Sequence, residues 1–264
     1  MGSATREALA SAVATLETVR GTDDLATGEQ LLRAAQIVGT SSQLRAALAD
    51  KSADGDAKRG VVRALFGSYT AAAQDVLVSA VAGRWSSEDD LLAGLEELGI
   101  RALASSAGEG VSIEAELFEF ERAVNSDSAL ELAVGSKLGS TESKVDLVQS
   151  LLGGKASAQT VLIVRHLVSQ PRGRRISELL RSATSTVASQ AGLAVATVTS
   201  ATRLAPAQVE RLAQGLAGQY GRGLRINQII DPSLIGGLRV QIGDNVIDGS
   251  IATKLNDLRL QLAR

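Results

Sequence analysis

The chain has 264 residues, a net charge of −2, no cysteine, and 45% hydrophobic but only 2% aromatic residues. The length allows one to three domains, and an apolar fraction built mostly from Ala, Leu, Val and Ile favours closely packed helices. The small net charge excludes a general attraction to nucleic acid or anionic lipid, and the lack of cysteine excludes disulfides and thiolate sites.

No segment predicts a membrane span or a secretion signal. The longest aliphatic run without alanine, Val161–Val164, is far shorter than the roughly 20 residues that a spanning helix needs. The first residues, Met1–Glu7, lack a hydrophobic signal core. We therefore expect a soluble chain without direct membrane insertion, which reaches a membrane only through another protein.

Apolar residues at helical spacing predict a series of helices from the N-terminus onward. The first covers Thr5–Arg20, and the second ends at Gly39. A short helix capped by Ser42 follows, and then a longer one that ends at Gly67. The segment Thr70–Ala82 is apolar around most of its circumference, so we expect it at the centre of a helical bundle.

A further helix is predicted to begin near Glu88, because Ser86 and Ser87 are each followed three residues later by an aspartate. Its apolar stripe consists of leucines: Leu91, Leu92, Leu95, Leu98 and Leu103. Trp85, directly before the two serines, is interpreted as a packing anchor at the helix junction.

The helical pattern repeats without a gap at an interval of 86 residues. The aligned pairs share hydrophobic stripes and a glycine that ends a helix: Leu31 with Leu117, Val38 with Val124, Leu44 with Leu130, Lys58 with Lys144, Leu65 with Leu151, Gly67 with Gly153, and Val78 with Val164. This indicates an internal duplication, in which the helix near Glu88 closes the first bundle and opens the second. The second bundle ends with a helix after Pro171–Arg175 that carries Ile176, Leu179 and Leu180.

After Gly192 the pattern changes to that of a small α+β unit, predicted in the order β-α-β-β-β-α. β-branched residues indicate a strand over Ala194–Ala201, and Pro206 opens a helix. The predicted fold is mainly α with a small α+β C-terminal domain. It consists of a helical bundle over residues 1–107, a second, repeat-like bundle over 108–191, and the α+β unit over 192–264.

The segment Asp231–Ser250 predicts a β-hairpin. Leu238, Val240 and Ile242 alternate with polar residues, as in a strand with one buried face. Gly236 and Gly237 allow a sharp turn before this strand, and Gly243–Asn245 has the composition of a hairpin turn before the short return strand. Ser250 is placed to cap a last helix, whose apolar stripe is Ile251, Leu255, Leu258 and Leu262.

This segment resembles the C-terminal signature of the delta subunit family of bacterial F-type ATP synthases, called the oligomycin-sensitivity-conferring protein in mitochondria. The resemblance is carried by Asp231–Gly237, by Gly243-Asp244 and by Ile247–Ser250. The order of a helical bundle followed by a small mixed domain is similar too. The chain departs from the usual member in having a second bundle. An enlarged N-terminal half occurs in some bacterial members, in which delta can be fused to a b-type stalk subunit.

The resemblance implies a stator, or peripheral stalk, subunit that has no catalytic activity and binds no cofactor. In the family, the N-terminal bundle holds the N-terminal helices of the alpha subunits between its first and fifth helices. The C-terminal domain holds the far end of the b-type stalk, so that rotary torque drives ATP synthesis. The implied location is the cytoplasmic face of the bacterial cell membrane, as a peripheral subunit.

Mapped by order, the first and fifth helices are Thr5–Arg20 and Thr70–Ala82, or Glu88–Ala107 and Ala156–Val168 in the second bundle. The sequence leaves open which pair binds alpha, and whether a b-type segment is fused upstream. In the first bundle, the alpha groove is expected to involve Leu9, Val13, Leu16, Ala73, Val76, Leu77 and Ala80. The stalk platform is expected to involve Leu234, Ile235, Gly236, Gly237, Asp248, Gly249 and Leu260, which lies opposite the stripe of its own helix.

No residue pattern predicts catalysis or metal binding. His166 is the only histidine, and without cysteine a zinc or triad-type site is poorly supported, so we expect a structural histidine. Arg172, Arg174 and Arg175 form the one compact basic cluster, interpreted as a solvated loop rather than a phosphate contact. Asp248 is interpreted as a turn residue rather than a catalytic acid.

Two other function classes remain open on these residues alone. A helical adaptor for nucleic acid or for another protein would be unrelated to ATP synthase, and in the first case would bind in a salt-sensitive manner. A small α+β enzyme with a helical accessory region would require clustered polar residues in a cleft, and the sequence indicates none.

Overall fold

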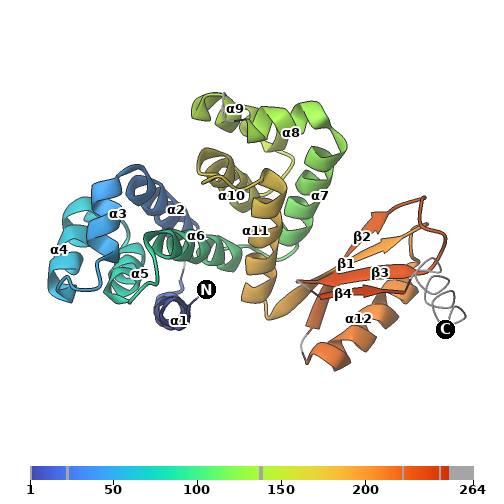
Figure 1. Ribbon diagram of the computed structural model, residues 1–264, viewed down its shortest axis with the longest axis horizontal. Coiled ribbons are helices and arrows are strands. Elements are labelled where there is room, and N and C mark those ends of the chain that lie inside the picture. Colours follow the sequence, from blue (N-terminus) through green and yellow to red (C-terminus); the bar gives the residue numbers. More distant parts are fainter. Residues whose placement is uncertain (1, 22–23, 137–138, 222, 244, 250–264) are drawn as a thin grey trace, which may run out of the picture. The chain divides into compact units, whose positions relative to one another are not determined.

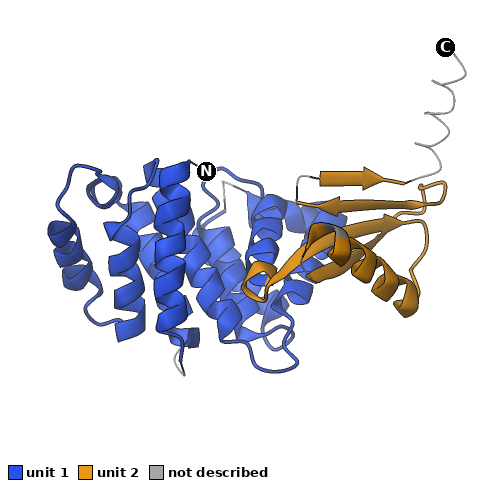
Figure 2. Cartoon of the chain, turned by 90° about the horizontal axis from the view of Figure 1, so that it is seen from below, with its two compact units in different colours: residues 1–187 blue, residues 188–264 orange. Residues whose placement is uncertain are grey.

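The computed structural model describes residues 2–21, 24–136, 139–221, 223–243 and 245–249. Within these residues the chain forms twelve helices and four strands (Figure 1). It divides into two compact units, Met1–Val187 and Ala188–Arg264, referred to below as unit 1 and unit 2 (Figure 2). The prediction of a mainly helical fold with a small α+β unit at its C-terminal end is confirmed.

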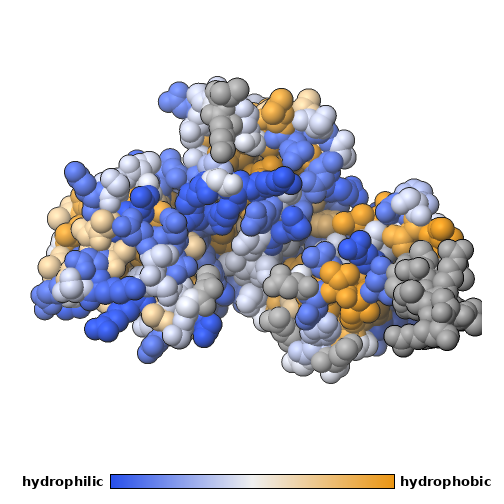
Figure 3. Space-filling view, viewed as in Figure 1, coloured by the Kyte–Doolittle hydropathy of each residue, from blue (hydrophilic) through white to orange (hydrophobic). Residues whose placement is uncertain are grey.

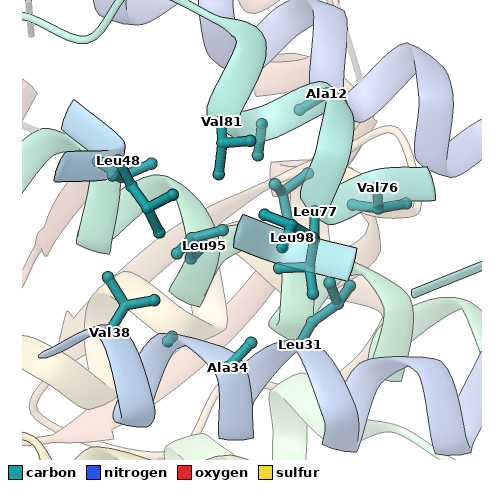
Figure 4. Packing of buried hydrophobic residues seen from close by; sticks show 14 of the residues in the cluster. Ala12, Leu31, Ala34, Val38, Leu48, Val76, Leu77, Val81, Leu95 and Leu98 are labelled. Carbon is teal, nitrogen blue, oxygen red and sulfur yellow. The ribbon is translucent and has the colours of Figure 1, made fainter. Parts of the chain in front are cut away.

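The first half of unit 1 is a bundle of helices. They are α1 (Ser3–Thr18), α2 (Asp24–Thr40), α3 (Ser42–Ala49), α4 (Gly55–Phe66), α5 (Ala71–Ala82) and α6 (Glu88–Ser105). Their apolar stripes meet in one core, in which Leu31, Leu77 and Leu95 point toward one another (Figure 4). Ala12 and Ala34 are fully buried there, and such small side chains allow helices to approach closely.

Side-chain caps determine where these helices begin. The hydroxyl of Ser41 accepts from the N–H of Leu44 at 3.2 Å, so the cap of α3 lies one residue before the predicted Ser42. Ser87 caps α6 by accepting from the N–H of Asp90 at 3.1 Å, as predicted. Ser86 instead donates its backbone N–H to Thr5 Oγ1 of α1 at 3.0 Å. Gly39 does not end α2, which continues to Thr40.

The second half of unit 1 reproduces the first at the predicted interval. It contains α7 (Ile113–Ser126), α8 (Ser128–Gly135), α9 (Thr141–Leu152), α10 (Ala158–Ser169) and α11 (Ile176–Gln190), of which the last three residues belong to unit 2. Adding 86 to the bounds of α3 and α4 gives the bounds of α8 and α9. For α2, α5 and α6 the same shift reaches α7, α10 and α11 to within three residues. The internal repeat is therefore a repeat of helices, and not only of composition.

Helix α6 belongs to both halves of unit 1. Its Leu91, Leu95 and Leu98 lie in the first core, whereas Ile100 and Leu103 lie in the second. This agrees with the expectation that one helix closes the first bundle and opens the second. We refer below to a first and a second bundle, which share α6. Their separation into two domains at residue 107 stays a prediction.

Unit 2 is a four-stranded mixed sheet with one helix packed on it. Its elements are β1 (Leu193–Ser200), α12 (Pro206–Tyr220), β2 (Gly223–Ile230), β3 (Leu238–Ile242) and β4 (Asn245–Asp248), with strand order β2-β1-β3-β4. β1 and β2 are parallel, and the other two pairings are antiparallel. Two parallel neighbours need a crossover, which α12 provides. The predicted last helix, with Ser250, Ile251, Leu255, Leu258 and Leu262, lies outside the described residues.

Candidate partner-binding surfaces

The predicted hairpin of unit 2 forms as β3 and β4, with Val240 opposite Ile247. Gly236 and Gly237 precede it with φ of 81° and 83°, a left-handed backbone that other residues rarely adopt. The N–H of Gly249 donates to the carbonyl of Leu238 at 2.9 Å and closes the end of the hairpin. The two glycines and this hydrogen bond therefore define the backbone at the two ends of the hairpin, where the expected stalk platform lies.

The platform residues differ in accessibility. Ile235 is 71% exposed, Asp248 is exposed on β4, and Leu234 is half-buried. The predicted contact residue Leu260 lies outside the described residues. Sequence reasoning missed the exposed aliphatic residues Ile229, Ile230, Val246 and Ile247 on the two edge strands. Hydrophobic patches are visible on unit 2 (Figure 3), and clustered apolar surface of this kind marks binding sites for other proteins.

The seven residues expected to line an alpha groove lie where α1 meets α5. Five of them are buried, and all of these but Ala73 belong to the first core: Leu16, Ala73, Val76, Leu77 and Ala80. Leu9 and Val13 are only partly buried against that core. Thr15 Oγ1 of α1 donates to Ser79 Oγ of α5 at 2.9 Å. The two helices are therefore in direct contact, and of the seven expected residues only Leu9 and Val13 keep partly exposed apolar surface beside this seam. The periodicity identified the stripe but could not show that α5 itself covers it.

A furrow of about 610 Å³ lies between α2 of the first bundle and α9 and α10 of the second. Each helix contributes one aliphatic side chain to its lining: Leu32, Val145 and Leu162. Charged residues flank them, namely Glu29, Arg33, Glu142, Asp146 and Arg165, and His166 also lines the furrow. We call this the inter-repeat furrow. The sequence could not have shown it, because its walls come from segments more than 100 residues apart.

Beside this furrow, a buried carboxylate joins the two bundles. Glu96 of α6 lies 2.9 Å from Arg172 Nη2 and 3.0 Å from Arg174 Nη2, and its Oε2 lies 3.3 Å from His166 Nε2. The interpretation of the arginine cluster as a solvated loop is therefore wrong for Arg172 and Arg174, while Arg175 is exposed. His166 is buried and structural, as expected.

The electrostatics of this cluster favour an ionised carboxylate. Burial alone would raise the pKa of Glu96, but the hydrogen bond with His166 and the charges of Arg172 and Arg174 lower it to about 2. Burial lowers the pKa of Arg172 despite the nearby carboxylate. Arg172 also has a φ of 46°, which is uncommon for a residue with a side chain. These features indicate that Glu96 holds the loop before α11 against α6.

Matched caps occur at the same place in both bundles. Gln30 of α2 accepts from the backbone N–H of Thr70 at 2.8 Å, at the start of α5. Its counterpart 86 residues later, Glu116 of α7, accepts from the N–H of Ser157 at 3.0 Å, at the start of α10. A side chain from the second helix of each bundle therefore ties down the fifth helix.

In the described part of the chain, no group of three or more histidine, aspartate or glutamate residues is arranged to hold a metal ion. Over the same residues, no helix combines the length and hydropathy of a membrane span.

Comparison with known proteins identifies the family. The model of the ATP synthase delta (OSCP) subunit family matches residues 100–262, a range that begins within α6. A delta subunit of ATP synthase from Leifsonia xyli subsp. xyli is 51% identical over 263 residues, which cover 100% of both chains. Another from Kineococcus radiotolerans is 41% identical and covers 92% of this chain and 90% of its own.

The relatives share the additional first bundle, since the alignments extend well before residue 100. A delta subunit from Streptomyces avermitilis is 37% identical and covers 98% of each chain. The part matched by the family model holds the second bundle and unit 2, so the first bundle is an extension that these long relatives have in common. The chain belongs to the ATP synthase delta (OSCP) subunit family.

Proposed function

We propose that the chain is the mechanical link of the stator between the catalytic head and the peripheral stalk of an F-type ATP synthase. Delta subunits are non-catalytic, and this one belongs to the peripheral stalk, at the membrane but not within it. The observation that carries the proposal is the match to delta subunits over the full length of the chain. Rotation loads such a link from both ends, so it needs firm contacts at each end rather than reactive groups.

Unit 1 is proposed to hold the head through the N-terminal helices of alpha subunits. Its helical faces suit the binding of a further amphipathic helix, which docks with residues spaced at i, i+3, i+4 and i+7. At the α1–α5 seam, such a helix would lie over Leu9 and Val13, which are only partly buried. The five buried residues of the seam would support these two from below.

Unit 2 is proposed to hold the b-type stalk subunit. Ile235 and the aliphatic side chains of β2 and β4 are exposed on it, and burying them against a partner would stabilise the complex by about 25 cal/mol per Å² before the costs of association. The paired glycines before β3 and the bond that closes the hairpin hold this surface in one shape.

The test is reconstitution on membranes of the source organism from which the native delta subunit has been removed. Adding the purified chain should restore ATP-driven proton pumping, whereas ATP hydrolysis by the head needs no delta subunit. A chain that is well folded and present in excess, yet restores no pumping, would refute the proposed function.

A further inference from the structure

The loop of residues 170–175, which joins α10 to α11 and is called the strap below, combines several unfavourable features. Arg172 is the only described residue other than glycine with a positive φ, at 46°, and Gly173 follows it at 78°. Nη2 of Arg172 is buried and has no well-aligned hydrogen bond within the described ranges. A cavity of about 10 Å³, lined in part by Gln170 and Arg172, lies beside it. Backbone strain persists only where surrounding contacts enforce it, and it is common in segments that switch.

One carboxylate holds the strap in this conformation. Glu96 of α6 lies 2.9 Å from Arg172 Nη2 and 3.0 Å from Arg174 Nη2. Further along α6, Ile100 and Leu103 are buried in the second core. The second bundle is therefore attached to α6 by an apolar contact near the end of this helix and by an ionic contact near its middle.

The corresponding loop of the first bundle is held in a different way. Trp85, the counterpart of Pro171 86 residues earlier, is 1% exposed, and its Nε1 donates to the carbonyl of Ala80 at 2.8 Å. None of residues 84–87 has a positive φ. A buried aromatic anchor stays with its core, whereas ion pairs at an interface can be exchanged when the packed parts move.

The internal repeat also indicates a second partner for the strap. In the first bundle, Arg45 Nε of α3 lies 2.8 Å from Glu88 Oε2 at the start of α6. The counterparts 86 residues later are Glu131 of α8 and Arg174, so the two charges are exchanged between the positions. Glu131 is exposed and forms no ion pair with a described residue, while Arg174 pairs with Glu96. The same cation thus has two carboxylates available to it.

The surroundings of the strap permit both arrangements. α8 ends beside the start of α11, because a Cβ on Gly135 would lie 3.9 Å from Ile176 Cγ2. Glu131 lies one helical turn before Gly135 on α8, and Arg174 lies two residues before α11. On the other side of the joint, the inter-repeat furrow separates α2 from α9 and α10. Its width can therefore change without breaking contacts along its walls.

We infer that the Glu96 cluster is a two-state latch between the two bundles. In the closed state, Arg172 and Arg174 pair with Glu96 and hold the second bundle against α6. In the open state, Arg174 pairs with Glu131, the backbone strain at Arg172 is released, and the second bundle tilts where α6 enters the second core, so that the furrow widens. The balance between the two states sets how stiffly the bundles are joined.

Distances between spin labels on the two bundles test the latch. The chain has no cysteine, so Ile37→Cys on α2 and Ser150→Cys on α9, both at exposed positions, provide two labels on opposite sides of the furrow. With the latch intact, one main distance is expected. Glu96→Gln should add a longer distance and raise the ratio of open to closed chains about tenfold or more, because the buried pairs that hold the strap are lost.

A second opening variant disturbs the core less. Arg172→Gln removes one cation from the cluster but leaves Glu96 paired with Arg174, so this variant should fold even where Glu96→Gln does not. It should raise the ratio of open to closed chains about threefold or more, because the closed state loses a partly buried ion pair that the open state does not contain.

Glu131→Gln identifies the partner in the open state. Added to either opening variant, it should lower the ratio of open to closed chains about two- to fivefold, which corresponds to the loss of one exposed ion pair. In chains that carry Arg174→Gln, the same substitution should leave the distances unchanged, because the cation shared by the two carboxylates is then absent.

The first bundle supplies a matched control. Glu88→Gln removes the ion pair with Arg45, which lies within that bundle, and should leave the distance between the labels unchanged. A single, unaltered distance in folded Arg172→Gln or Glu96→Gln chains would overturn the latch, as would an equal lengthening by Glu88→Gln. A longer distance that does not respond to Glu131→Gln would overturn the exchange of partners. The latch lies within unit 1, so none of these results affects the proposed function.

Discussion

At the scale of single residues, the joint between the two bundles depends on one buried charge. Glu96 interrupts an apolar helix face, and the polar side chains around it are His166 of the second bundle and two arginines of the loop that follows α10. Carrying a carboxylate into the interior is unfavourable unless partners compensate for the lost hydration. The cluster therefore specifies how α6 meets the second bundle more than it adds to net stability.

Replacing this carboxylate by its neutral isostere should be costly. Glu96→Gln leaves Arg172 and Arg174 partly buried without a counter-charge, and breaking such a pair typically lowers the free energy of unfolding by about 3 kcal/mol. Urea unfolding measures the difference. Glu119→Gln on α7, whose pair with Arg122 is more than half exposed, should cost less than about 1 kcal/mol. Equal losses of unfolding free energy in the two variants would show that the burial of Glu96 does not make its ion pairs more important for stability than an exposed pair.

The same residue predicts a pH dependence of stability. The pKa of Glu96 is lowered from 4.5 to about 2 in the folded chain, so the folded state binds fewer protons than the unfolded state between these values. Its stabilising contribution, roughly 3 kcal/mol at most, is present above the ordinary pKa and is lost as pH falls toward about 2. The lowered pKa of Arg172 offsets part of it.

The measurement compares the unmodified chain with Glu96→Gln over this range. The difference between their free energies of unfolding should shrink as pH falls from about 6 to about 3, because protonation makes Glu96 resemble glutamine. A difference that stays constant would show that Glu96 does not titrate as described.

At the scale of elements, α2 and α6 pack closely because each has a glycine facing a leucine of the other. A Cβ on Gly28 would lie 2.6 Å from Leu103 Cγ, and one on Gly99 would lie 2.6 Å from Leu32 Cδ2. Periodicity predicted both helices and their leucine stripes. Periodicity could not explain these glycines, because a glycine within a helical pattern lowers helix propensity. Its role in close packing becomes clear only when the neighbouring helix is known.

Gly99→Ala should therefore destabilise the chain by about 1–3 kcal/mol, since overpacking outweighs the gain of up to about 1 kcal/mol in helix propensity. Gly60→Ala on α4 is the control, because a Cβ there would have no neighbour within 4 Å, and only the propensity gain remains. In thermal unfolding, Gly99→Ala should have a lower melting temperature than the unmodified chain, and Gly60→Ala a higher one. A stabilised Gly99→Ala variant would contradict the close α2–α6 packing.

The matched caps make another prediction at this scale. Glu116 accepts from the N–H and hydroxyl of Ser157 and from the hydroxyl of Thr160, whereas Gln30 accepts only from Thr70. Glu116→Ala should cost about 2 kcal/mol and Gln30→Ala about 1 kcal/mol, because a charged acceptor makes stronger hydrogen bonds. Hydrogen exchange at the first turns of α10 and α5 would localise each effect. If Glu116→Ala accelerated exchange at the start of α5 and not at the start of α10, these cap assignments would be contradicted.

At the scale of the whole molecule, the sequence predicted the order of elements better than the surfaces. Chain order, the repeat interval and the hairpin follow from local patterns, which is why α3 and α4 recur so closely as α8 and α9. The exposed surfaces depend instead on which helices pack over each apolar stripe. Val76 and Leu77 belong to a stripe that the fold buries, and the inter-repeat furrow needs α2 beside α10. Neither relation is encoded in local periodicity.

The proposed function requires that force pass from unit 1 to unit 2. The chain passes from the helices of unit 1 to the sheet of unit 2 through the end of α11, and Ala191 and Gly192, which are exposed, join α11 to β1. A protease site inserted there should leave both units bound to their partners after cleavage but no longer joined to each other. Once the link is severed, the effective concentration that one chain provides is lost. ATP-driven proton pumping should then fall while ATP hydrolysis continues.

The control is the same insertion at Glu109, in the exposed loop between α6 and α7. The residues on either side of this loop pack into one core, in which Leu103 and Ile113 are both buried. Cleavage there should leave unit 1 assembled and pumping intact, because buried contacts rather than the chain itself hold the pieces together. Pumping that survives complete cleavage at Gly192 would show that torque is borne by some other connection, and the chain would then be a spacer within the stator rather than its link.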